Sequence, residues 1–96
     1  MKPSETLAIH RDAVRAIVEA HHACNTRVFG SVARGTDGAG SDLDLLIDAT
    51  VHTSLFDLGA IQAELQELLE TPVEVVTSRA LPAAFRDAIL QAAIAV

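Results

Sequence analysis

The sequence predicts a small α/β (α+β) domain, in which one mixed sheet of about three strands is covered by helices in the order αββαβα. Three segments carry apolar residues at helical spacing, and three short segments between them have the alternating or apolar pattern of strands. A chain of 96 residues is long enough for one hydrophobic core and too short for two. We therefore treat residues 1–96 as a single domain.

The first half of the chain predicts a helix, a strand and one helical turn. The helix runs from Glu5 to about His22 and has an apolar face made by Leu7, Val14, Ile17 and Val18. The segment TRVFG is then a short strand ending at Gly30, where the missing side chain permits close approach of backbone or ligand. SVARG is typical of a helical turn and TDGAG of a loop.

The second half predicts two strands and two helices. Strict alternation from Asp42 to Asp48 indicates the second strand, and VEVVT the third. Between them, Ser54 and Asp57 form a capping box for a helix that ends at Thr71-Pro72. A last helix begins at Pro82, and its expected apolar face is made by Phe85, Ile89, Ala93 and Val96.

Composition excludes several classes of function. The formal net charge is −6 and the chain has no Trp or Tyr, which argues against binding a nucleic acid but not against binding one nucleotide. The single Cys24 excludes an internal disulfide and is expected to be a small buried apolar residue. No segment has the pattern of a membrane span or signal peptide, so we expect a cytoplasmic protein.

Two aspartates lie on one side of the second strand. Residues i and i+2 of a strand share a face, so Asp42 and Asp44 converge while Leu43, Leu45 and Ile47 face the core. Unpaired neighbouring carboxylates repel each other, and hard oxygen ligands at this spacing suit Mg²⁺. The alternative is an ordinary solvent-facing strand side, which an isolated Asp-x-Asp more often indicates.

Upstream residues favour the metal interpretation. Gly30-Ser31 lies where a strand ends and a helical turn begins, and so offers backbone N–H groups and a hydroxyl to an anion. Arg34 follows in that turn, where it either binds phosphate oxygens or forms an exposed salt bridge. Neither a Walker A loop nor a dinucleotide-binding glycine pattern is present.

Gly30-Ser31, ten intervening residues and then Asp42-Leu43-Asp44 resemble the signature of the DNA polymerase β-like nucleotidyltransferase superfamily. The phrases FGSVARG, SDLDLLID and VEVVT are similar to those of its minimal nucleotidyltransferases, one-domain proteins that commonly pair with a HEPN-domain partner. The resemblance covers nearly the whole chain and implies the nucleotidyltransferase fold.

The resemblance also implies a reaction. Two Mg²⁺ ions would be held by Asp42, Asp44 and a third carboxylate, and AMP would pass from ATP to a hydroxyl group. Gly30 and Ser31 would hold the triphosphate, with Arg34 and Ser41 beside it, although Ser41 also suits a local cap. The third carboxylate is usually an aspartate, whereas this chain has Glu74, which lies on the aspartates' side if the second and third strands pair.

Other polar residues have no assigned role in the reaction. Asp48 lies too far along the strand to share the metals, His21 and His22 diverge as neighbours on a helix, and the directions of Arg27 and Arg79 are not fixed by the sequence.

The apolar end AAIAV, together with helix faces beside it, is expected to help bury a partner.

Three functions are consistent with these observations. The first is an antitoxin that transfers AMP to a HEPN ribonuclease toxin, and the second is a nucleotide-binding module that neutralises its partner by contact. The third, transfer to a small molecule, is weaker because 96 residues leave little room for an acceptor pocket. Glu74 is the residue that separates the first two.

Overall fold

A computed structural model describes residues 1–96 and shows four helices, four strands and one 3₁₀ turn. Along the chain these are α1 (Pro3–Ala20), β1 (Ala23–Phe29), α2 (Gly30–Arg34), β2 (Leu43–Ala49), α3 (Leu55–Leu69), β3 (Val73–Thr77), η1 (Ser78–Ala80), α4 (Ala83–Ala92) and β4 (Ile94–Ala95). None of the helices is both long and apolar enough to cross a membrane.

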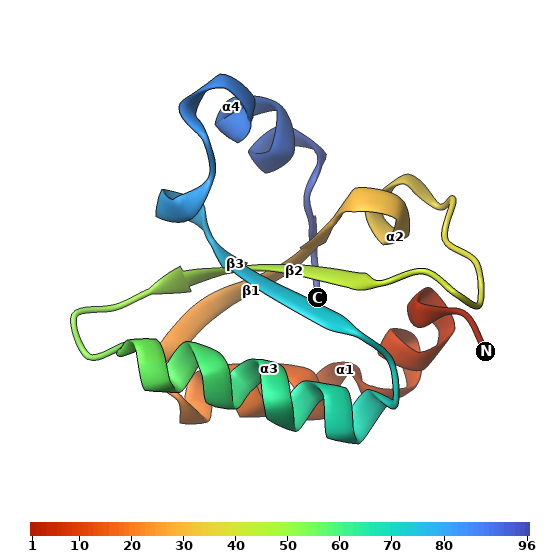
Figure 1. Ribbon diagram of the computed structural model, residues 1–96, viewed down its shortest axis with the longest axis horizontal. Helices are drawn as coiled ribbons and strands as arrows, with labels where there is room; N and C mark the ends of the chain where they lie inside the picture. The colour runs from red at the N-terminus through yellow and green to blue at the C-terminus, as the bar shows by residue number, and fades with distance from the viewer.

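The strands form one mixed sheet in the order β3-β2-β1-β4. β1 runs antiparallel to β2 and β4, and β2 runs parallel to β3. Helices α1 and α3 cover one face of the sheet, while α2 and α4 lie on the opposite side (Figure 1). The predicted α/β class and mixed sheet are confirmed, with one strand more than expected.

The hydrophobic core lies between the sheet and the α1–α3 layer. Leu43, Leu45 and Ile47 of β2 are fully buried there, as the alternation predicted. They pack in one cluster with the apolar stripes of the two helices, whose fully buried members are Val14, Val18, Ile61 and Leu65. The odd-numbered side chains of β2 thus anchor the strand, and the even-numbered ones face the other side.

The end of the chain differs from the prediction. The last helix ends at Ala92 rather than continuing to Val96, and Ile94–Ala95 pairs with Arg27 and Val28 of β1. Phe85 is 60% exposed and α4 has no buried residue, so of the residues expected on the helical face only Val96, which lies beyond the helix, is buried in the core. The open edge of β1 offers backbone hydrogen bonds that outweigh the helix propensity of this alanine-rich end.

Cys24 is exposed, which makes the expectation of a buried cysteine wrong. The register of β1 against β2 shifts between Cys24 and Arg27, and Asn25 has φ 56°. A bulge of this kind inserts an extra residue and moves the inside–outside alternation by one position. Ala23 and Thr26 therefore face inward and Cys24 does not.

The capping box at the start of α3 is confirmed. The backbone N–H of Asp57 donates to Ser54 Oγ at 3.1 Å, and the N–H of Ser54 donates to Asp57 Oδ2 at 2.8 Å. The Ser54 N–H is the chief reason that the pKa of Asp57 lies below its usual range. His21, at the end of α1, contacts Asp57 and Glu64 of α3, so it joins the two helices.

We expect Ser54→Ala to lower the free energy of unfolding by about 1 kcal/mol, because the Asp57 N–H loses its acceptor at the first turn of α3. Urea denaturation measures this change. Gln62→Ala, on an exposed position in the middle of α3, is the matched control and should leave the free energy of unfolding nearly unchanged. Equal effects of the two substitutions would contradict the capping role.

Candidate functional site

Two carboxylates lie side by side at the start of the parallel strands β2 and β3. Asp44 and Glu74 are register partners, and both lie on the sheet face opposite the α1–α3 layer. Asp42 directly precedes the first residue of β2. It lies two positions before Asp44, and side chains two positions apart in an extended chain lie on the same side. The second and third strands therefore pair, which is the condition under which the sequence predicted Glu74 on the aspartates' side, and the pairing brings Glu74 next to Asp44.

The neighbouring carboxylates raise the cost of ionising Asp44. Asp44 is half-buried, and this burial raises the pKa of its carboxyl group; the negative charges of Glu74 and Asp42 raise it further. The charge of Arg34 acts in the opposite direction, but Arg34 forms no ion pair with Asp44. Negative charge is therefore concentrated here without a cation in contact.

Gly30 lies directly against Asp44. Phe29, the last residue of β1, is the register partner of Asp44, and Gly30 follows with φ 70°. A Cβ atom added at Gly30 would collide with Asp44 Oδ2. The glycine is thus required twice, for its left-handed backbone and for the space that the carboxylate occupies.

The remaining residues of the motif surround this contact. Ser31 is half-buried in the first turn of α2, a helix of five residues, and Arg34 is exposed at its end. Ser41 Oγ accepts the backbone N–H of Gly38 at 2.9 Å, so Ser41 acts as the local cap that the sequence suggested as its other role. Its place among nucleotide-binding residues stays a prediction.

The donor chemistry fits a hard divalent cation. Asp42 and Glu74 are exposed, Asp44 is half-buried, and all three offer carboxylate oxygens, which Mg²⁺ prefers. In the conformation described here, the chain has no group of three or more His, Cys, Asp or Glu side chains spaced to hold a metal. The three carboxylates would therefore have to come closer together to share one ion.

The negative charge of a second acidic residue on the same face is balanced by an ion pair and hydrogen bonds. Asp48 of β2 accepts hydrogen bonds from Arg27 Nη2 at 2.7 Å and Asn25 Nδ2 at 2.8 Å, and a further one from Ser78. Burial raises the pKa of Asp48, but the hydrogen bonds and the Arg27 charge outweigh it and hold that pKa below its usual range. Arg27 is thereby committed to Asp48, which the sequence did not reveal.

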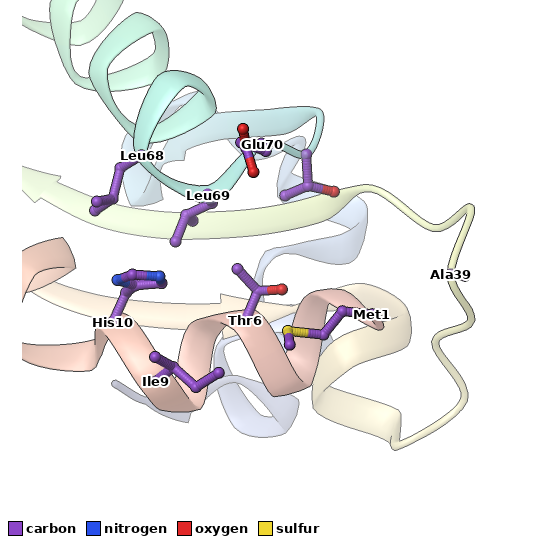
Figure 2. A pocket seen from close by; sticks show the side chains of 9 residues that line it. Met1, Thr6, Ile9, His10, Ala39, Leu68, Leu69 and Glu70 are labelled. Carbon is purple, nitrogen blue, oxygen red and sulfur yellow. The ribbon is translucent and has the colours of Figure 1, made fainter.

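The carboxylates lie on an open surface rather than in a cavity. The largest cavity, about 420 Å³, is formed by the first half of α1, the end of α3 and Ala39 (Figure 2). A second one of about 280 Å³ is lined by Ala49, Thr50, Val51 and Arg79. Asp42, Asp44 and Glu74 line neither cavity, whereas Arg79 lines the second one.

Comparisons with known proteins agree with this geometry. Residues 10–96 match the family model described as "Nucleotidyltransferase domain". Two proteins of Methanocaldococcus jannaschii are similar: "Putative protein adenylyltransferase MJ0435", 34% identical over 77% of this chain and 80% of that protein, and "Putative protein adenylyltransferase MJ0126", 32% identical over 81% and 80%.

Two solved structures share the fold. One, described as "Structure of putative minimal nucleotidyltransferase", superposes with a TM-score of 0.84 at 38% identity and covers 97% of this chain and 93% of its own. The other, described as "Crystal structure of the toxin-antitoxin with AMP-PNP", has a TM-score of 0.72 at 15% identity, covering 97% and 71%. With the Gly30–Asp44 contact and the paired carboxylates, these matches show that the chain belongs to the nucleotidyltransferase domain family, among the minimal nucleotidyltransferases of the DNA polymerase β-like superfamily.

Proposed function

We propose that this nucleotidyltransferase uses Mg²⁺ to transfer AMP from ATP to a hydroxyl of a partner protein, and that it acts as the antitoxin of a HEPN-type ribonuclease toxin. The observation that carries the reaction is the pairing of Asp44 with Glu74 in register, with the Gly30 backbone against Asp44. The protein-modifying activity is supported by the names of the two archaeal relatives. The toxin partner is supported by the family resemblance and by the toxin–antitoxin neighbour's shared fold.

Asp42, Asp44 and Glu74 are the residues that would hold the metal, and Gly30 and Ser31 would bind the triphosphate, with Arg34 and Ser41 beside it. Divalent cations, when bound, neutralise the transferring phosphoryl group and lower the pKa of the attacking hydroxyl. The hydroxyl oxygen forms a bond to the α-phosphorus, and the bond from that phosphorus to the β-phosphate oxygen breaks. Pyrophosphate leaves, and Glu74 accepts the proton of the hydroxyl.

The open surface favours a protein as the acceptor. A small-molecule acceptor needs a concave site that buries most of its surface, and neither cavity of this chain includes the carboxylates. A partner protein brings its own surface and can complete the site around the nucleotide. We place that partner in the cytoplasm with this chain, as the sequence predicts.

A binding module is the second candidate function, and Glu74 is the observation that favours it. Glu74 replaces the usual aspartate, is one methylene longer and is exposed. A carboxylate displaced by that length can leave nucleotide and partner binding intact while transfer is slow. In this case the protein neutralises its partner by contact alone.

We expect Asp44→Asn to weaken Mg·ATP binding at least about tenfold, because losing a metal ligand costs no less than losing a group that orients one. Without cation, the same variant should be as stable as the parent or more stable near neutral pH, since it removes repulsion. Calorimetry and urea denaturation measure the two effects. Unchanged Mg·ATP affinity would contradict the metal assignment.

Asp48→Asn is the matched control for that variant, because Asp48 lies on the same face of the same strand but is bonded to Arg27. It should lose stability and keep its Mg·ATP affinity, the opposite of Asp44→Asn.

The pH dependence of stability should also have opposite signs for Asp44 and Asp48. The pKa of Asp44 is raised, so the stability linked to Asp44 falls as pH rises from about 4 through that raised value. The pKa of Asp48 is lowered, so its contribution is present above about pH 4 and is lost as pH falls further.

We expect Glu74→Gln to slow transfer by about 10²- to 10⁴-fold while partner binding stays nearly constant, because the amide keeps the size and loses the base. Glu74→Asp should keep or raise the rate. The measurement is the intact mass of the partner, which gains one AMP, at equal saturation with Mg·ATP. Parent-like transfer by Glu74→Gln would remove Glu74 from the reaction; no transfer by all three proteins would favour the binding module.

The partner surface is expected to include α4 and the end of the chain. Phe85 is 60% exposed and Ile94 51% exposed, and apolar side chains of this size are typical of interface cores. Adding the toxin partner should therefore slow amide hydrogen exchange in residues 83–95. Unchanged exchange there, with a highly soluble monomer before addition, would contradict this location.

A further inference from the structure

The loop of residues 36–42, between α2 and β2, carries Asp42 to the site with very little packing of its own. A Cβ atom added at Gly38 or Gly40 would meet nothing within 4 Å. Ala39 is exposed and lies at the rim of the 420 Å³ cavity, across from α1 and α3 (Figure 2). Contacts between apolar side chains therefore do not determine where this loop lies.

Asp37 is the exception in this loop. It is 8% exposed, and its Oδ2 accepts the backbone N–H of Ser4 at 2.9 Å, from a residue 33 positions earlier in the chain. That hydrogen bond is the main reason that the pKa of Asp37 lies below its usual range, and the charge of Lys2 acts in the same direction. Asp37 is thus a carboxylate at neutral pH and is bonded to α1.

The start of α1 has a donor that its own capping residue does not satisfy. Lys2 occupies the N-cap position, and a lysine side chain has no acceptor atom. Ser4 is the second residue of the helix, a position whose N–H an N-cap oxygen normally receives. Asp37 takes over that function from the loop.

The helix end to which Asp37 is bonded is itself fixed. Pro3 is fully buried and Leu7 is 4% exposed in the hydrophobic core. A hydrogen bond to Ser4 therefore connects the loop to the core of the protein. Figure 1 shows the N-terminus of α1 beside the loop that leads from α2 into β2.

The chain between Asp37 and Asp42 is a closed turn. The N–H of Ser41 donates to the Gly38 carbonyl at 3.0 Å, and the N–H of Gly38 donates to Ser41 Oγ at 2.9 Å. Leu43 begins β2 with a hydrogen bond to the Pro72 carbonyl. Because the turn is closed, a displacement of Asp37 moves Asp42, which has no strand partner of its own.

We propose that Asp37 is a positioning residue for the nucleotidyl transfer, which holds Asp42 beside Asp44 by tying the loop of residues 36–42 to the start of α1. The inference rests on the proposed function, in which Asp42 binds the metal. Asp37 itself touches neither metal nor substrate in this mechanism. Its effect on the reaction passes through Asp42.

The experiment compares Asp37→Ala, Asp37→Asn and Glu5→Ala. Glu5 is the matched control, because its carboxylate accepts the Lys2 N–H at the same helix end but does not contact the loop. Two quantities are measured: amide hydrogen exchange in residues 36–42 of the chain without partner, and Mg·ATP affinity by calorimetry. Urea denaturation of all four proteins checks that each is folded.

We expect Asp37→Ala to raise the exchange rates in residues 38–42 severalfold and to weaken Mg·ATP binding severalfold. Asp37→Asn keeps an acceptor oxygen for the Ser4 N–H, so its exchange rates in residues 38–42 and its Mg·ATP affinity should be close to those of the parent. Glu5→Ala should lower stability without changing either quantity.

The proposal is overturned if Asp37→Ala and Glu5→Ala have the same exchange rates in the loop and the same affinity. It is also overturned if the loop exchanges faster in Asp37→Ala while Mg·ATP affinity stays at the parent value, because the loop then does not position Asp42. Failure of the proposed function looks different: the parent protein itself would not bind Mg·ATP, whatever residue occupies position 37.

Discussion

The structure depends on the place of the Asp44 carboxylate, which lies between the Gly30 backbone and the neighbouring Glu74. This arrangement needs β1 antiparallel to β2, so that Phe29 ends opposite Asp44 and the chain can turn there. It needs β3 parallel to β2, so that Glu74 comes into register from the same end. It also needs a glycine at position 30, because any side chain would occupy the space of the carboxylate. The mixed sheet and the spacing of the motif together bring Gly30 and Glu74 against Asp44.

Asp44 and Asp48 show how the same strand face can hold two aspartates with opposite effects. Asp48 is bonded to Arg27, Asn25 and Ser78, so its charge is compensated within the protein. Asp44 is surrounded by carboxylates, and the burial that raises its pKa is not balanced by an ion pair. At neutral pH the ionised Asp44 therefore lowers the stability of the folded protein, whereas the ionised Asp48 raises it. We interpret the uncompensated position as the one that a cation completes.

The sequence predicted the parts of this fold that local patterns determine. Alternation of Leu43, Leu45 and Ile47 identified β2 and its buried face, and the Ser54–Asp57 pair identified the start of α3. The glycine–serine and aspartate motif predicted that Gly30 and Asp44 lie close together, as they do, and the parity of Glu74 placed it beside Asp44 once strand pairing was assumed. These predictions succeeded because periods of two and of 3.6 residues are imposed by the backbone itself. The roles of the site residues in catalysis remain predictions.

The errors and omissions arose where contacts between distant residues decide the conformation. Residues 94–95 form a strand because the edge of β1 is free, and Cys24 is exposed because Asn25 adopts a left-handed backbone in a bulge. Asp37 went unnoticed because nothing in TDGAG indicates a bond to Ser4. A lysine at the N-cap of α1 is the one local sign that an acceptor must come from elsewhere. A poorly capped helix start is therefore a reason to look for a distant carboxylate, and here that carboxylate lies in the loop leading to the proposed metal ligand.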